Sequence, residues 1–342
     1  MEYEIELKLL TDEKAGDIIE TKLLPQLNAK VTQETLKLTN HYFDTPDATL
    51  RQHKIGLRIR GSDQTFEQTL KTAGKSVGGL HQRPEYNVQL DEKKNHNINV
   101  PDLRLFPLSA WPITIDVDDL QHKITALFTT DFERKIYLLE FSDGNIVELV
   151  WDFGEVRSSE KSIAICEIEL ELKKGSTRAL FDIAKCIVSL LPTSIGMHSK
   201  AALGYQLLDN LPEKELEHYQ HLQPDNMKAE AEEFASLLTT LLHDFQVLSA
   251  QLRHQYSEVV ATNIKQVLLG LVYNFGMFNQ HFPCPSLDTM HIQLKGLLNE
   301  WCLVAHQNNE SAANALLVRA QTTQLQLDIV QCLVEQSWVC EV

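Results

Sequence analysis

The sequence predicts an α+β protein in two parts, an antiparallel sheet that closes on itself or nearly so and a following all-α bundle of about four helices. Up to about residue 205, many segments alternate polar and apolar residues with period two. After residue 227 helical spacing replaces this alternation, and several of the predicted strands carry charge on one face only. A chain of 342 residues is long enough for two domains with separate cores.

The predicted strands are short and are separated by turns. They cover residues 4–10, 57–61, 65–71, 83–90, 134–141, 146–154 and 164–173. Two helix-like stretches lie among them, at 11–24, where Thr11 and Asp12 are capping candidates, and at 175–191. Many strands with few helices favour an antiparallel sheet that closes or nearly closes.

One face of these strands is charged, because residues two apart in a strand point the same way. The tetrapeptide EIEL occurs twice, at 4–7 and at 167–170, and it puts two carboxylates on one face and aliphatic side chains on the other. Arg58 and Arg60 share a face in the same manner. A barrel with a charged interior and an apolar outside satisfies both faces. An open sheet with an ordinary solvent-exposed face is the alternative.

The second part of the chain begins after a polar stretch with two prolines. We expect a sheet domain at 1–208, a linker at 209–226 and a helical bundle at 227–342, with helices at 227–255, 257–281, 286–306 and 311–338. The bundle is the more acidic part for its length. It therefore offers no basic groove for a polyanion.

Composition narrows the possible partners and compartment. The formal net charge of −16 argues against a general nucleic-acid or anionic-membrane surface. The start of the chain lacks a basic and then apolar leader, and no stretch is long and apolar enough to span a bilayer. Six scattered cysteines without a CxxC pair indicate free thiols. We expect a cytoplasmic protein whose oligomeric state is open.

The charged residue types indicate a particular chemistry. HExxH and GxSxG are absent, and Gly74-Lys75-Ser76 is not a P-loop because Thr69 replaces its first glycine. Grouped carboxylates suit a hard divalent cation such as Mg²⁺ or Mn²⁺, and Lys and Arg on neighbouring strands suit phosphate oxygens. Together they favour a site for a metal–polyphosphate complex. Internal salt bridging alone is the other explanation.

A series of motifs resembles the CYTH superfamily, also called triphosphate tunnel metalloenzymes. The first is ExExK at residues 4–8, and the others follow in order: HYFDTPD at 41–47, LRIR at 57–60, EQTLK at 67–71, HQRPEYN at 81–87, DFER at 131–134, ELVWDFG at 148–154, EIELE at 167–171 and SKAALGY at 199–205. The resemblance implies an eight-stranded antiparallel barrel around a hydrophilic tunnel. HQRPEYN and the appended helices look most like bacterial CYTH–CHAD proteins that hydrolyse inorganic triphosphate, which makes residues 227–342 a short CHAD-like bundle.

The resemblance also implies roles for individual residues. The implied substrate-binding bases are Lys8, Arg58, Arg60, Lys71, Arg83, Arg134 and Lys200. The implied metal-binding carboxylates are Glu4, Glu6, Glu148, Asp152, Glu167, Glu169 and Glu171. Glu4, Glu6, Lys8 and Glu85 are the implied catalytic residues, and Glu85 resembles a carboxylate that helps a second metal or orients the attacking water.

The expected function is metal-dependent hydrolysis of inorganic triphosphate to pyrophosphate and phosphate, with two Mg²⁺ or Mn²⁺ ions in the active site. Relatives act as hydrolases or cyclases on organic triphosphates such as thiamine triphosphate or ATP. No aromatic cluster clearly supplies a platform for an organic group. A polyphosphate-binding sensor without turnover is a third possibility, although pure anion binding would not require so many carboxylates.

Overall fold

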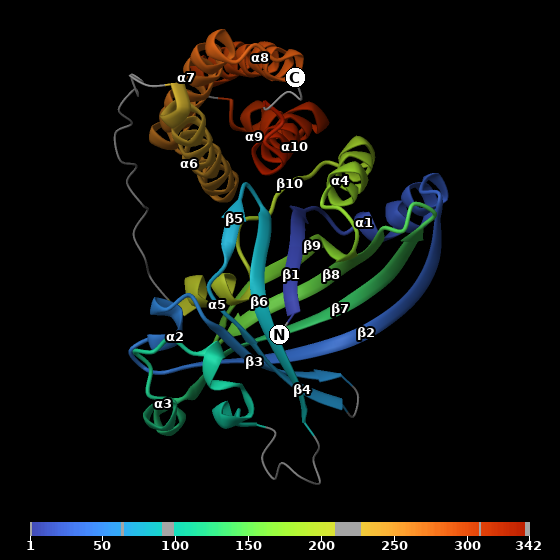
Figure 1. Cartoon of the computed structure of the whole chain (residues 1–342), viewed down its shortest axis with the longest axis vertical. Helices are drawn as coiled ribbons and strands as arrows, with labels where there is room; N and C mark the ends of the chain where they lie inside the picture. The colour runs from blue at the N-terminus through green and yellow to red at the C-terminus, as the bar shows by residue number, and fades with distance from the viewer. Residues whose placement is uncertain (1, 63–64, 91–98, 209–226, 308, 339–342) are drawn as a thin grey trace.

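The computed structural model describes residues 2–62, 65–90, 99–208, 227–307 and 309–338 (Figure 1). Ten strands in this part of the chain form one antiparallel sheet. They are β1 (Glu2–Leu10), β2 (Ala29–Asp44), β3 (Gly56–Ser62), β4 (Thr65–Lys71), β5 (Lys75–Val77), β6 (Leu80–Leu90), β7 (Thr125–Phe141), β8 (Ile146–Ser158), β9 (Lys161–Lys174) and β10 (Ser194–Ile195).

Eight of these strands close into a barrel. The order is β1–β9–β8–β7–β2–β3–β4–β6, and β6 pairs with β1 to complete the circle. The short strands β10 and β5 pair with β1 and β6. The predicted closed sheet is therefore confirmed, and the open sheet is wrong. The charged faces of the strands point to the inside of this closed barrel.

Strand β2 is the main element that the sequence pattern does not predict. Its residues 31–35 are exposed, so no apolar alternation marks them. The strand forms because β7 pairs with it along its whole length, from Ala29 opposite Phe141 to Asp44 opposite Thr125. Backbone hydrogen bonding to β7, and not a local pattern of side chains, thus determines that this segment forms a strand.

Helices near the barrel are few and mostly short. They are α1 (Ala15–Ile18), α2 (Thr49–Gln52), α3 (Val117–Lys123), α4 (Arg178–Leu190) and α5 (Lys200–Leu208). The predicted helix at 11–24 is wrong in length. Only one α-helical turn forms, followed by a π-helical turn at Ile19–Leu23 and a 3₁₀ turn at Leu24–Gln26 that contains Pro25, a residue that cannot donate a helical hydrogen bond.

The C-terminal region is all-helical. It contains α6 (Met227–His254), α7 (Glu258–His281), α8 (Pro285–His306), α9 (Glu310–Val318) and α10 (Ala320–Glu335). The predicted single helix at 311–338 is wrong, because Arg319 has an extended backbone and separates α9 from α10. The side chain of Arg319 forms an ion pair with Glu300 on α8, and its Nε donates a hydrogen bond to the Thr322 hydroxyl. The predicted linker at 209–226 lies outside the described residues.

The helical region packs directly on the barrel. Figure 1 shows α6 and α10 beside the β5–β6 hairpin and β10. One continuous apolar core joins barrel residues such as Leu7 with helical residues such as Leu242. Gly78, in the hairpin with φ 52°, lies against Leu242 and Val330, so a side chain there would collide with both. Thr323 on α10 donates a 2.6 Å hydrogen bond to the Thr193 carbonyl, which strengthens the same contact.

The shared core predicts that both parts unfold together. We expect Leu242→Ala, which empties a fully buried position, to lower the free energy of unfolding by about 2–5 kcal/mol. The measurement is chemical denaturation followed by tryptophan fluorescence, which reports Trp111 and Trp151 of the barrel part together with Trp301 and Trp338 of the helical part, and by circular dichroism. Leu269→Ala on α7, where the side chain is 40% exposed, is the control and should change stability little. A helical region that unfolds separately at a lower denaturant concentration would contradict the prediction.

Candidate functional site

The barrel encloses a polar cavity of about 590 Å³. Every predicted substrate-binding base lines it, and so do most of the predicted carboxylates. The lining includes Glu4, Glu6, Lys8, Arg58, Arg60, Lys71, Arg83, Glu85, Arg134, Glu148, Glu169, Glu171 and Lys200. Asp152 and Glu167 are 0% and 1% exposed and lie against the same charged groups.

Strand pairing explains how residues far apart in sequence meet. Lys8 on β1 stands opposite Glu169 on β9, and Asp152 on β8 stands between Glu167 on β9 and Arg134 on β7. Residues directly opposite in antiparallel strands project on the same side of the sheet. Three adjacent strand pairs therefore bring these side chains to one part of the interior.

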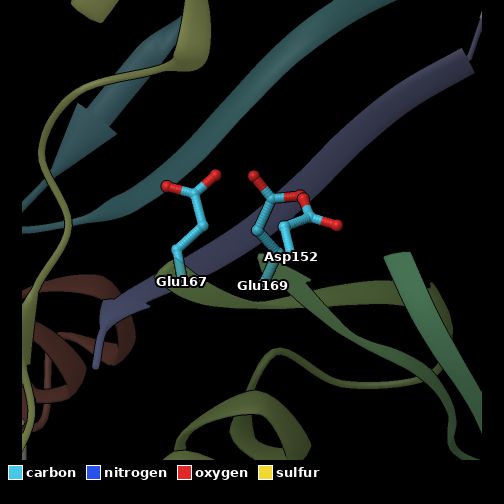
Figure 2. A group of neighbouring side chains, drawn as sticks. All are labelled: Asp152, Glu167 and Glu169. Atoms are coloured by element: carbon cyan, nitrogen blue, oxygen red, sulfur yellow. The ribbon is translucent and has the colours of Figure 1, made fainter. Parts of the chain in front are cut away.

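Asp152, Glu167 and Glu169 form the deepest group, the inner cluster (Figure 2). One carboxylate oxygen of each lies within 4.8 Å of the others. Three cations contact them: Arg134 donates to both oxygens of Asp152 at 2.7 and 2.6 Å, Lys200 contacts all three acids, and Lys8 contacts Glu167 and Glu169. Three acids and three bases leave the inner cluster electrically balanced.

This balance keeps the inner cluster ionised despite burial. Burial opposes the charge on Glu169, but Lys200, Lys8 and Arg134 hold the pKa of its carboxyl well below the usual value. Burial likewise opposes the charge on Lys8, and Glu167 and Glu169 outweigh it, so the pKa of Lys8 is raised well above its usual value. Each group is charged because its neighbours are charged.

A second set of pairs lies along β1, β4 and β6. Lys71 contacts Glu4 at 2.6 Å and Glu85 at 3.2 Å, and Arg83 contacts Glu4 at 3.1 Å and Glu6 at 2.9 Å. Burial raises the pKa of Glu4, but Lys71 and Arg83 outweigh it and bring this pKa down to about 2. Glu4 is therefore an anion at any ordinary pH.

Arg60 is the exception to this pairing. Its Nε donates to the Asn40 side-chain oxygen at 3.0 Å, and among the described residues it makes no ion pair with a carboxylate. Burial, followed by the positive charges of Arg58 and Arg134, lowers the pKa of Arg60 to about 9. The cavity therefore contains three neighbouring guanidinium groups, one of them without an acidic partner.

Glu148, Glu171 and Lys173 lie together toward the β7–β8 turn. Lys173 contacts Glu171 at 2.8 Å and Glu148 at 3.4 Å. Burial raises the pKa of Glu171 to about 7; Lys173 opposes the shift, and Glu4 and Glu148 add to it. Lys173 is not among the residues predicted from the sequence, although it continues the alternation of Glu167, Glu169 and Glu171 by one more step.

The structure also adds lining residues that no periodic pattern reveals. Arg51 and Lys54 lie in and just after the short helix α2, where no strand alternation applies. Two aromatic residues reach the cavity. Tyr42 is stacked on Phe128 with ring centroids 4.9 Å apart, and the Arg51 guanidinium covers the Tyr205 ring at 4.7 Å.

Lys135 lies outside the cavity, as its strand position predicts. It contacts Glu20 at 2.8 Å and the outer face of Trp151, while the adjacent Arg134 points inward. These two adjacent residues therefore face the inside and the outside of the barrel, as the alternation of side chains along a strand requires.

A closed barrel with paired carboxylates and cations inside and apolar side chains outside defines a charged-interior barrel protein. The chain belongs to the CYTH family, because the model of the CYTH domain matches residues 2–202, more than half of its length. The match does not extend to α6–α10, so the likeness of these helices to a CHAD domain stays a prediction.

Individual relatives share this part of the chain. A Haemophilus influenzae protein named inorganic triphosphatase is 40% identical over 210 residues, which are 60% of this chain and 55% of the relative. The chain thus spans about half the length of the curated relative that it matches. Two solved structures are similar over 61% and 60% of this chain and 98% and 99% of theirs. They are a putative adenylyl cyclase from Hippeastrum (21% identity, TM-score 0.44) and the PH1819 protein of Pyrococcus horikoshii (15%, 0.39).

None of the described helices is both long and apolar enough to cross a membrane.

The lone charge of Arg60 predicts an unusual effect on stability. We expect Arg60→Met to leave the ligand-free protein as stable as wild type or more stable, because the substitution removes a desolvated cation without an acidic partner. Arg134→Met is the matched comparison and should destabilise by about 3–5 kcal/mol, since Asp152 loses its two-point partner. Thermal denaturation measures both. Equal losses would show that Arg60 is held by interactions other than those described.

Proposed function

We propose that this protein hydrolyses inorganic triphosphate to pyrophosphate and phosphate inside the barrel. The observation that carries the proposal is the group of Arg58, Arg60 and Arg134, where Arg60 lacks a carboxylate, directly beside a buried carboxylate cluster. The guanidiniums suit a polyanion, and the carboxylates suit hard cations that accompany it. The name of the Haemophilus influenzae relative supports the same activity.

The inner cluster has the right chemistry for a divalent cation. Asp152, Glu167 and Glu169 offer only oxygen donors, within 4.8 Å of one another, which is the ligand type that Mg²⁺ and Mn²⁺ prefer. We propose these three residues as the first metal ligands, with Glu4, Glu6, Glu148 and Glu171 available for a second ion. A bound cation would supply charge neutralisation at the phosphoryl oxygens.

The chain's own cations would position the substrate. Arg58, Arg60 and Arg134 can each bind two phosphate oxygens, and the buried Lys8 and Lys200 add point charges. These groups hold the chain of phosphates in one orientation and stabilise the charge that develops on the leaving pyrophosphate. Phosphoryl transfer depends mainly on such positioning and charge stabilisation.

The reaction adds water across one P–O–P linkage. The water oxygen bonds to a terminal phosphorus, the bridging P–O bond breaks, and pyrophosphate leaves. We propose that Glu4, Glu6 and Glu85 orient this water and that Glu85 accepts its proton, since the three carboxylates lie together on neighbouring strands and are fixed by Lys71 and Arg83. Lys8 stabilises the charge on the phosphoryl group.

Inorganic triphosphate fits better than an organic triphosphate. Binding of a base or a ring favours an aromatic face to stack on, and the two cavity tyrosines have their rings against Phe128 and under Arg51. Phe43 belongs to the outer apolar core, and Tyr86 packs against it. A sensor without turnover would not need the buried carboxylate cluster.

The decisive experiment compares substrates and metals. We expect turnover of inorganic triphosphate with Mg²⁺ or Mn²⁺, much slower turnover of ATP and thiamine triphosphate, and negligible activity after EDTA treatment that returns when metal is added. Phosphate release and product chromatography measure all of these. Faster turnover of an organic triphosphate would show that inorganic triphosphate is not the preferred substrate. Full activity in EDTA would contradict the metal-dependent mechanism.

A matched pair of variants tests the inner and outer faces of the barrel. Glu169→Ala removes a carboxylate that contacts three cations in the cavity and should lower kcat by at least about a hundredfold. Lys135→Ala removes a charge from the outside of the barrel and should leave kcat within about twofold. Steady-state kinetics with saturating metal gives both values, and circular dichroism confirms folding. Equal losses would place the reaction elsewhere.

A further inference from the structure

The two ends of the cavity can be identified from the strand connections. Strand β2 ends at Asp44 and leads into α2, so α2 lies at one end of the barrel. Strand β7 runs antiparallel to β2, which places the β7–β8 turn at the other end. Figure 1 shows α2 and the far ends of β7 and β8 on opposite sides of the barrel. The cavity lining includes residues near both ends.

The α2 end is basic and rigidly built. Arg51 and Lys54 line the cavity there. The fully buried Asp44 accepts hydrogen bonds from the backbone N–H groups of Leu50 (2.8 Å) and Arg51 (3.0 Å) and from the Tyr205 hydroxyl (2.6 Å). The Arg51 guanidinium rests on the Tyr205 ring. Asp44 therefore positions the backbone that carries the Arg51 cation.

The opposite end is acidic. Glu67, two residues into β4, lines the cavity on the side of the β3–β4 connection, and Glu148 and Glu171 line it near the β7–β8 turn. Two bases lie among these three acids: Arg60 on β3 stands opposite Glu67, and Lys173 contacts both Glu148 and Glu171. The charge of the lining thus changes sign from one end of the cavity to the other.

We propose that the anionic substrate enters and leaves through the α2 end, past Arg51 and Lys54, and that the acidic end excludes it. The inference rests on the proposed function for the identity of the anion. A charged opening concentrates ligands of opposite sign and raises their association rate, and the effect falls as salt shortens the range of the interaction. A triphosphate carries several negative charges, so the basic end attracts it and the acidic end repels it.

This polarity also defines the substrate class further. A linear polyphosphate longer than the site extends out through the basic end, where Arg51 and Lys54 contact the additional phosphates. A long polyphosphate can thus bind with one of its ends inside the barrel. It does not pass through the whole barrel, because it would then have to pass the acidic end.

The test measures association and turnover in variants of the α2 end. Arg51→Gln/Lys54→Asn removes two positive charges, and asparagine suits the left-handed backbone of Lys54 (φ 57°). We expect kcat/KM and the stopped-flow association rate for magnesium tripolyphosphate to fall about tenfold at low ionic strength, with kcat within about twofold. The deficit should shrink at high salt and should be larger for tetrapolyphosphate.

Two controls separate the local effect from net charge and from folding. Lys30→Gln/Lys37→Gln removes the same charge from exposed positions on β2 and should leave the association rate unchanged. Glu67→Lys makes the opposite end more basic and should change association by less than about twofold. Thermal denaturation confirms that each variant is folded.

The outcomes are distinct. An unchanged association rate in the α2 double variant, or an equal loss in the β2 control, overturns the proposal. A marked gain in Glu67→Lys would assign substrate passage to the acidic end instead. If wild-type protein binds tripolyphosphate without hydrolysing it, the proposed function fails, while the association rates still decide between the two ends.

Discussion

Charge matching inside the barrel is the constraint on which the rest of the structure depends. Glu169 contacts Lys8, Arg134 and Lys200, which come from β1, β7 and α5, so the groups meet only when β1, β9, β8 and β7 pair in this register and α5 is in place. Removing one partner from such a buried set typically costs about 3–5 kcal/mol, because the remaining charge is left desolvated. The polar interior therefore specifies one register for the strands, and the apolar clusters on the outside supply favourable burial.

The same matching explains how the proposed site can work with a highly charged substrate. In the ligand-free protein the carboxylates and cations neutralise each other. A metal–triphosphate complex offers each set a new partner: phosphate oxygens replace carboxylates beside the arginines and lysines, and cations replace lysines beside the carboxylates. The interior stays near neutrality throughout, so binding avoids the large penalty of burying an uncompensated charge. Arg60, which has no carboxylate partner among the described residues, can bind a phosphate oxygen without first breaking an ion pair.

The helical region supports one side of the site, and the connections of the barrel make the two ends of the cavity different. Helices α6 and α10 share a core with the barrel and pack on the β5–β6 hairpin and β10, beside the strand that carries Lys8. Gly196, directly after β10, lies against the aliphatic part of the Lys8 side chain, and its N–H donates to the Lys8 carbonyl at 2.9 Å. The helices therefore stabilise the segment that supports a cavity base. The α2 connection at one end and the β7–β8 turn at the other carry opposite charges, which breaks the symmetry of the barrel.

The sequence by itself determined the sheet and bundle order, the charged face of the strands and most of the site. Alternation with period two is a local property, so Glu4, Glu6 and Lys8 could be assigned to one face before any partner strand was known, and the motif series supplied the roles of the rest. Only the tertiary structure decided that β2 is a strand, that Arg319 interrupts the last helix, and that Arg60, unlike the other six predicted substrate-binding bases, makes no ion pair with a carboxylate among the described residues. Only it placed Arg51 and Lys54 at one end of the cavity and Glu67 at the other. The physical reason is that these features depend on which strands pair and how loops fold back on them, and such long-range contacts leave no periodic signal in the chain.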